Sequence, residues 1–156
     1  MANPVYLTLN GDLQGLISAG CCSLVSIGNK AQIAHMDQII VLGLSHGLTR
    51  AQNVNHQMLV IEKPVDKSSP LLTKAISENE CLTCDFEYYR TNRFGINELY
   101  YKVKLINASI AHHVPHTITN SQGQPEESVS LTYESITQEH CTAGTSAYSL
   151  WEERLF

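Results

Sequence analysis

Residues 59–72 read LVIEKPVDKSSPLL, and this stretch joins a strand pattern directly to the start of a helix. Its first part continues an apolar run that begins at Met58 and is typical of a strand. In its second part Ser69 can cap the free amides of a helix, and Pro70 then occupies the first helical position, where a missing N–H costs nothing. The stretch therefore predicts a strand, a tight connection and one short helix over about residues 69–78.

The predicted helix has one apolar side. Leu71, Leu72, Ala75 and Ile76 fall at spacings that bring them together on that side. A single amphipathic helix of this length, in a chain that otherwise shows strand patterns, is expected to cover an opening in a β structure or one of its sides.

Most of the remaining chain alternates between apolar and polar residues with a period of two, which is typical of strands with one face on a core. Residues 91–97, with Gly95, predict a turn between two paired strands, and Gly123 and Pro125 mark a polar loop before the last strand. At least seven strands and one helix predict a mainly β, closed or nearly closed barrel, because closure removes exposed edges. Residues 1–156 are expected to form a single domain. The alternating or strand-like runs are residues 5–9, 39–44, 58–62, 82–88, 99–105, 108–112 and 129–133.

The composition argues against several classes of partner. The net charge is -5 and the 10 lysines and arginines are scattered, so no basic surface is expected for nucleic acid or for anionic lipid. Residues 1–10 carry neither the basic segment nor the long apolar segment of a signal peptide, and the longest apolar runs are too short to span a bilayer. We therefore expect a chain that is made in the cytoplasm, does not insert into membranes and needs no signal peptide for any export.

Several segments follow, in order, the strands of one known family. Residues 4–7 (PVYL) are similar to its first strand, and residues 41–47 (VLGLSHG) to its second. Residues 86–90 and 99–101 resemble its central hairpin, and residues 127–133 resemble its late strand. Taken together, the segments resemble the Hcp (haemolysin-coregulated protein) family of type VI secretion systems.

The strongest part of this resemblance lies in residues 59–72. They are similar to the family signature of a strand followed by Lys-x-x-Asp-x-Ser-Ser/Thr-Pro-x-Leu. Each piece of the signature is common by itself, but the ordered set covers nearly the whole chain. The residues that fall on the signature are Lys63, Asp66, Ser68, Ser69, Pro70 and Leu72.

The resemblance implies both a fold and a function. The fold is a two-sheet barrel of antiparallel strands with one short flanking helix, in agreement with the strand pattern. The function is structural: hexameric rings stack into the inner tube of the secretion system, in contact with its sheath, baseplate and tip spike proteins. The ring lumen can carry small effector proteins, and the subunit is itself secreted through the apparatus. The resemblance implies no catalytic residue, cofactor or metal, and the chain ends too soon after Trp151 for an attached toxin domain to be expected.

Two features depart from the family pattern. Residues 18–38 make a longer connection between the first two strands, with a turn expected at Gly28 and Asn29. Gln138 stands just after the late strand, where many relatives carry an aromatic residue. Both departures can change how neighbouring subunits meet.

Residues 48–56 form a polar connection without alternation, which follows a strand that ends near Gly47. In relatives the matching connection is an extended loop that reaches the next ring, so the resemblance implies a stacking element. The alternative left open is an ordinary solvated hairpin loop. The residues expected to make contacts between rings are Thr49, Arg50, Asn53, Val54 and Asn55.

Five cysteines invite a metal or redox interpretation. Cys81 and Cys84 form a C-x-x-C pair, but a structural zinc needs four ligands, and Cys21 and Cys22 are adjacent rather than spaced as a second pair. On a strand, residues 81 and 84 point to opposite faces. With Cys141, these residues are interpreted as reduced thiols.

A histidine cluster is the other candidate metal site. His112 and His113 would point to opposite faces of a strand, and Pro115, just before His116, predicts a strand end. We expect surface or lumen histidines without a metal.

Two other functions remain open at this point. A monomeric ligand-binding β-barrel would enclose an apolar pocket. A small metal-dependent enzyme would use the cysteines and histidines, although the sequence contains no nucleophile elbow, phosphate loop or paired zinc-protease histidines.

Overall fold

The computed structural model describes residues 4–28, 31–119 and 125–151, with only the backbone described for residues 116–119. Strands dominate, and the longest helix is α2 (Ser69–Ser77). The remaining elements are β1 (Val5–Gly11), β2 (Gly15–Leu16), α1 (Leu24–Ile27), the 3-10 turn η2 (Ile33–His35), β3 (Ile39–Val41), β4 (Gly43–Ser45), β5 (Leu48–Arg50), β6 (Val54–His56), β7 (Leu59–Pro64), β8 (Leu82–Thr91), β9 (Asn97–Thr119), β10 (Pro125–Thr132), β11 (Ser135–His140) and β12 (Thr145–Leu150).

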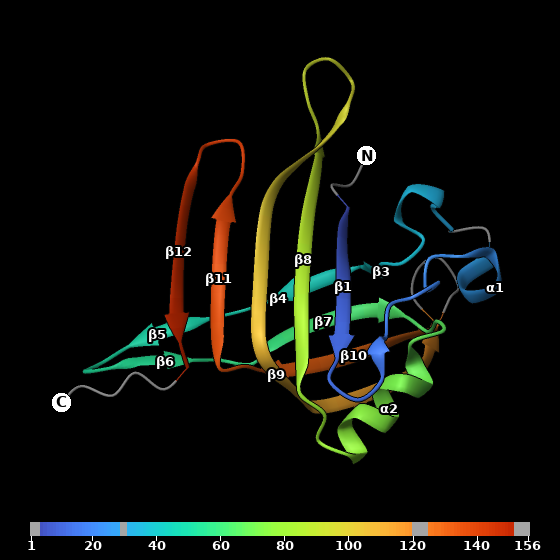
Figure 1. Ribbon diagram of the computed structural model, residues 1–156, viewed down its shortest axis with the longest axis horizontal. Coiled ribbons are helices and arrows are strands. Elements are labelled where there is room, and N and C mark those ends of the chain that lie inside the picture. Colours follow the sequence, from blue (N-terminus) through green and yellow to red (C-terminus); the bar gives the residue numbers. More distant parts are fainter. Residues whose placement is uncertain (1–3, 29–30, 120–124, 152–156) are drawn as a thin grey trace.

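The strands form two antiparallel layers that share β9 (Figure 1). One layer contains β1, β8, the first part of β9, β11 and β12, with β2 and β3 paired to β1. The other contains the last part of β9, then β10, β7 and β4. The predicted two-sheet barrel with one short flanking helix is confirmed.

The strand β9 passes from one layer to the other. It has 23 residues; residues 97–108 pair with β8, and residues 109–119 pair with β10. The bend lies near Asn107, which has a φ of 50°, a left-handed conformation that asparagine tolerates better than most residues. The prediction that Pro115 ends a strand is wrong: Pro115 lies within β9 beside a register irregularity, where a missing N–H is tolerated.

The core lies between the two layers, and α2 covers one end of it. Leu72 and Ala75 of α2 are buried in the core cluster, and Leu71 and Ile76 pack against that cluster from partly buried positions. The predicted apolar side of the helix is confirmed. A cavity enclosed by core side chains from β1, β3, β7, α2 and β10 measures only about 10 Å³, no more than a single water molecule needs.

Several elements differ from the sequence-based expectation. Gly123 lies outside the described residues, and β10 is not the last strand, because β11 and β12 follow it. Gln138 lies within β11, opposite Val103 of β9 and Ala147 of β12. Residues 18–38 contain α1 and η2, and Gly28, which follows α1, has a φ of 65°. Asn29, the other residue of the expected turn, lies outside the described residues.

The two outer edges of the first layer differ in character. Within the described residues, β12 pairs with β11 alone, so one side of β12 forms an open edge. Its side chains are mostly exposed, including 75% of Tyr148 and 45% of Leu150. The opposite edge consists of the short strands β2 and β3. No helix in the described part of the chain is both long and apolar enough to cross a membrane.

Candidate functional site

The signature residues build a buried charge cluster at the junction of β7 and α2. The Lys63 side chain is fully buried, and its ammonium donates to the Pro64 carbonyl oxygen at 3.0 Å and to Asp66 Oδ1 at 3.0 Å. It also donates to Oε1 of Glu127 on β10. A buried ammonium is tolerated only when its protons are bound in this way. Lys63 therefore ties the end of β7 both to the turn before α2 and to β10.

Glu127 is the centre of the acidic side of this cluster. Ser69 Oγ donates to Glu127 Oε1 at 2.7 Å, and His113 Nε2 lies 2.8 Å from Glu127 Oε2. Burial alone would raise the pKa of Glu127, but the Lys63 ammonium and the hydrogen bonds hold that pKa below its usual range. Glu127 is thus held ionised, and His113 is part of a buried network rather than the surface or lumen histidine that we expected.

Asp66 organises the turn that starts the helix. Its Oδ1 accepts hydrogen bonds from the Ser68 amide at 2.9 Å and from the Ser68 hydroxyl, and its carbonyl oxygen accepts one from the Ser69 amide at 3.1 Å. The prediction that Ser69 caps the helix is wrong, because the helix begins at Ser69 itself and Pro70 is its second residue. The Ser69 hydroxyl is instead committed to Glu127, where it satisfies a buried carboxylate.

The cluster has no group free for chemistry. Within the described residues, every buried side-chain nitrogen and oxygen has a hydrogen-bond partner. A saturated network of this kind fixes β7, β9, β10 and α2 relative to one another. The signature thus marks a structural junction.

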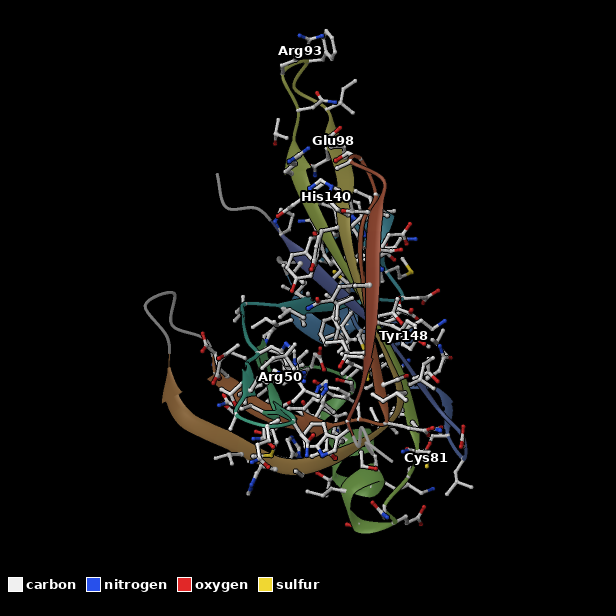
Figure 2. All side chains as sticks on the ribbon, turned by 90° about the vertical axis from the view of Figure 1, so that its left-hand side faces the viewer. Arg50, Cys81, Arg93, Glu98, His140 and Tyr148 are labelled. Atoms are coloured by element: carbon white, nitrogen blue, oxygen red, sulfur yellow. The ribbon has the colours of Figure 1, made fainter. Side chains whose placement is uncertain are left out.

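The segment 48–56 forms a two-stranded sheet that is separate from the main one. Figure 1 shows β5 and β6 reaching away from the body, and Figure 2 shows Arg50 on that side. The expectation of a loop without alternation is wrong, since Thr49 pairs with Asn55 and Arg50 with Val54. Thr49, Arg50, Asn53 and Asn55 are exposed and Val54 is half-buried, so the residues predicted to contact a neighbouring ring lie on an accessible hairpin.

The base of this hairpin is held by two histidines that sequence reasoning did not identify as a pair. His46 Nε2 and His56 Nδ1 each lie 2.7 Å from the Tyr133 hydroxyl oxygen. His56 Nε2 lies 2.9 Å from Ser149 Oγ, and the His56 ring stacks on Trp151 at a centroid distance of 5.6 Å. The only signal in the sequence is that His46 lies just before the polar segment 48–56 and that His56 ends it.

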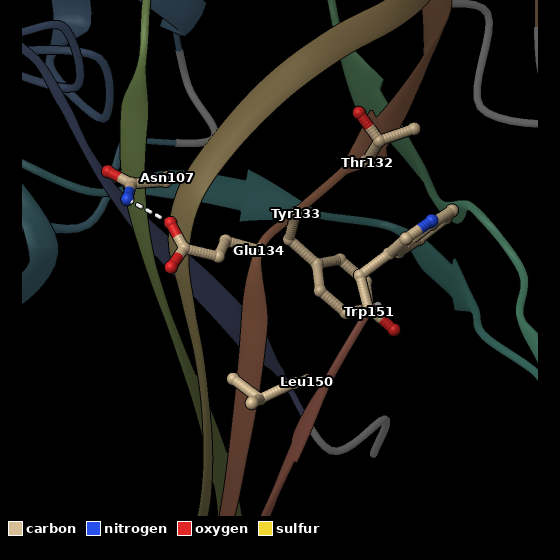
Figure 3. Close-up of a pocket in the computed structure, with 6 residues that line it drawn as sticks. All are labelled: Asn107, Thr132, Tyr133, Glu134, Leu150 and Trp151. Carbon is tan, nitrogen blue, oxygen red and sulfur yellow. Dashed lines mark hydrogen bonds between the residues drawn. The ribbon is translucent and has the colours of Figure 1, made fainter. Parts of the chain in front are cut away.

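A pocket of about 660 Å³ lies beside this anchor (Figure 3). Figure 3 shows Glu134 turned toward Asn107, whose side-chain amide donates to the Glu134 carboxylate. The pocket is open, because it lies outside the core at the junction of β10, β11 and β12. It is lined by Asn107, Thr132, Tyr133, Glu134, Leu150 and Trp151.

The cysteines do not converge on one site. Cys81 is exposed, as Figure 2 shows, whereas Cys84 is buried, which confirms that they face opposite ways. Burial raises the pKa of the Cys21 thiol to about 12, and also raises the pKa values of Cys22 and Cys84. Across the residues whose structure is described, no three His, Cys, Asp or Glu side chains gather as metal ligands. The side chain of His116 lies outside the described residues.

Comparison with known proteins identifies the family. The sequence model described as "Type VI secretion system effector, Hcp" matches residues 6–140. The chain is 36% identical to the "Major exported protein" of Pseudomonas aeruginosa over 97% of its own length and 96% of that protein. It is also 37% identical to the "Uncharacterized protein YhhZ" of Escherichia coli K12, of which it spans 37%.

Solved structures agree with the sequence comparison. The secreted protein Hcp3 from Pseudomonas aeruginosa superposes with a TM-score of 0.89 at 35% identity, over 97% of this chain and 100% of that one. A crystal structure of an Hcp protein matches with a TM-score of 0.91 at 29% identity, over 98% and 100%. Sequence and shape therefore agree, and the chain belongs to the Hcp family, the tube proteins of the type VI secretion system.

Proposed function

We propose that the protein forms closed hexameric rings that stack into the inner tube of a type VI secretion apparatus, and that it is secreted as part of that tube. The observation that carries this proposal is the pair of sheet edges on opposite sides of the first layer, with β12 on one side and the short β2 and β3 on the other. Family membership supports the number of subunits and the tube.

The open edge of β12 favours assembly over a monomer. An exposed strand edge pairs readily with another chain, and monomeric proteins usually block it with charges or proline. Residues 145–150 (TSAYSL) carry neither, and they expose the side chains of Tyr148 and Leu150. Two different edges on opposite sides of one sheet suit a heterologous contact, which closes into a ring when the rotation allows it.

The β5–β6 hairpin is the proposed contact between rings. Its tip is polar and exposed, and it projects from the body rather than packing on the core. Contacts of this kind are individually weak, but the same contact is repeated around a ring and gains strength by avidity. Thr49, Arg50, Asn53, Val54 and Asn55 are the proposed stacking residues.

The remaining parts of the proposal follow from the same family. The protein acts as one domain, residues 1–156, without catalysis, and it needs no cofactor. It resides in the cytoplasm until the apparatus fires and is exported without a signal peptide. Its partners are further copies of itself, the sheath, baseplate and tip spike proteins, and small effector proteins in the lumen. The core cavity of about 10 Å³ is too small for a ligand, which argues against a ligand-binding barrel.

Light scattering and negative-stain imaging test the proposal. The wild-type protein is expected to form rings with a hole, and a variant with residues 50–55 shortened to a tight turn is expected to form rings but no tubes. The substitution Arg50→Ala should weaken stacking, whereas Lys74→Ala on the exposed side of α2 is the matched control. A clean monomer would overturn the ring, and normal stacking of the shortened variant would overturn the role of the hairpin.

A further inference from the structure

The β5–β6 hairpin depends on its base for its position. A two-stranded hairpin is at best marginally stable by itself in water, and this one forms a sheet separate from the barrel. The side-chain hydrogen bonds that join segment 46–57 to the barrel include those from His46 and His56 to Tyr133 and from His56 to Ser149. Whatever changes these bonds therefore changes how firmly the hairpin is held.

The geometry determines which of the three groups donates a hydrogen bond and which accepts one. Burial raises the pKa of Tyr133 to about 12, so its hydroxyl keeps its single proton at any physiological pH. That hydroxyl can donate to one imidazole nitrogen and must accept an N–H from the other, because both nitrogens lie 2.7 Å from the same oxygen. Two neutral imidazoles satisfy this requirement, whichever of them donates to the Tyr133 oxygen and whichever accepts from it. A further hydrogen bond, between His56 Nε2 and the Ser149 hydroxyl, extends the same network.

We propose that His46, Tyr133 and His56 form a proton-controlled latch, which holds the β5–β6 hairpin against the barrel while both imidazoles are neutral and releases it in acid. When the accepting imidazole gains a proton, both rings direct an N–H at the phenol oxygen, and the phenol proton loses its acceptor. The phenol oxygen then lies between two N–H donors, one of them on a positively charged ring. The latch operates within one subunit, and only its effect on stacking rests on the proposed function.

The surroundings of the latch favour the neutral state of His46. Burial lowers the pKa of His46, and the neighbouring His56 lowers it further. Within the described residues, Tyr133 is a further titratable group of the anchor. The adjacent Glu134 is exposed and bonded to Asn107. Trp151 stacks on His56, and Glu152 and Glu153 follow it in the sequence, outside the described residues.

The sign of the pH effect follows from the lowered pKa. Because His46 binds its proton less tightly in the folded protein, its contribution to holding the hairpin is complete above the unfolded pKa of about 6.5. That contribution is lost as the pH falls through the lower pKa of the folded state. The latch is thus closed at neutral pH and opens in mild acid.

Hydrogen exchange tests the latch. Amide protection in residues 48–50 and 54–56 is measured at about pH 7.5 and about pH 5, with exchange rates corrected for intrinsic pH dependence. In the wild type, protection should fall about tenfold between the two conditions, which corresponds to about 1.4 kcal/mol, while protection of β8 stays constant. Trp151 is the only tryptophan of the chain and stacks on His56, so its emission should shift to the red over the same pH range.

Two variants make the test specific. Tyr133→Phe keeps the packed ring but removes the shared hydroxyl, so hairpin protection should be low at both pH values. His112→Phe removes an exposed imidazole on β9 and should behave as the wild type. Hairpin protection that does not change with pH, an equal pH dependence in Tyr133→Phe, or an equal loss of protection in β8 would each overturn the latch. Light scattering of the same samples at neutral pH reports on ring formation separately.

Discussion

The signature residues form only part of the buried charge cluster, and their partners lie far away in the sequence. Lys63, Asp66 and Ser69 lie close in sequence and were identified from the family pattern. Their partner Glu127 lies 64 positions after Lys63, and His113 lies on a different strand. A sequence shows that a charged residue sits in an apolar strand, but only the pairing of β7 with β10 and of β10 with β9 shows what neutralises it. The local half of the cluster was predictable and the distant half was not.

Removing the buried ammonium should be severely destabilising. Lys63→Met leaves Glu127 and Asp66 buried without their counter-charge, so the free energy of unfolding should fall by about 3–5 kcal/mol. Lys102→Met, at an exposed position of β9, should change it by less than about 0.5 kcal/mol. Urea unfolding followed by circular dichroism measures both, and a small effect of Lys63→Met would mean that the cluster does not hold the junction.

Glu127 predicts a characteristic acid dependence. Its pKa is lowered in the folded state, so its contribution to stability is present above the unfolded pKa of about 4.3 and is lost as the pH falls through the lower folded value. Glu127→Gln should lower stability near neutral pH and should flatten the loss below about pH 4.3. Melting temperatures measured against pH give the comparison, with Glu139→Gln on the exposed side of β11 as the control that should keep the wild-type profile.

Among the elements, most strands with a buried face were predictable, whereas β5, β6 and β12 were not. In β8, the first five residues alternate between buried and half-buried, and the period-two pattern found it. In β12 only Ser149 is even half-buried, so no alternation marks it as a strand. β5 and β6 have three residues each, too few for a pattern to appear. The helix α2 was predicted to within one residue of its end, because its apolar spacing reflects real packing.

Substitutions in α2 distinguish the apolar packing of the helix on the core from its hydrogen bond to Glu127. Leu72→Ala should cost about 2–5 kcal/mol, because it opens a cavity at a buried position, and the half-buried Ile76→Ala should cost less. Ser69→Ala removes a hydrogen bond to an ionised carboxylate and should cost about 1.5–3 kcal/mol. Denaturant unfolding of the three variants provides the ranking, and equal small effects would contradict the placement of the helix against the core.

At the scale of the whole molecule, the barrel and its surfaces have separate tasks. The core is almost filled and the buried polar atoms are bonded, so the body is a rigid support. The outward features proposed for assembly are the open edge of β12 and the β5–β6 hairpin. The fold class and the family were predictable from ordered motifs. The open edge was not predictable, because it depends on the order of the strands in the sheet, which the sequence pattern does not reveal.

Charges on the open edge should separate folding from assembly. In the variant Tyr148→Lys with Leu150→Lys, both changes fall on exposed side chains, so the thermal unfolding of the subunit should change by no more than a few degrees. Ring formation should be lost, because edge pairing would bury the lysine charges and would lack the apolar contacts of Tyr148 and Leu150. Light scattering with a thermal melt measures both properties, and intact rings would show that β12 does not take part in the subunit contact.

The continuous strand β9 has a mechanical consequence. Its 23 residues belong to both layers, and its backbone carries hydrogen bonds to β8, β11 and β10. A force parallel to such a strand loads many hydrogen bonds in shear at once, whereas a force perpendicular to the strand at its end would break them one by one. The two layers also cannot separate without pulling against a covalent chain. A subunit pushed from one layer should therefore transmit the load to the other and yield as a single unit.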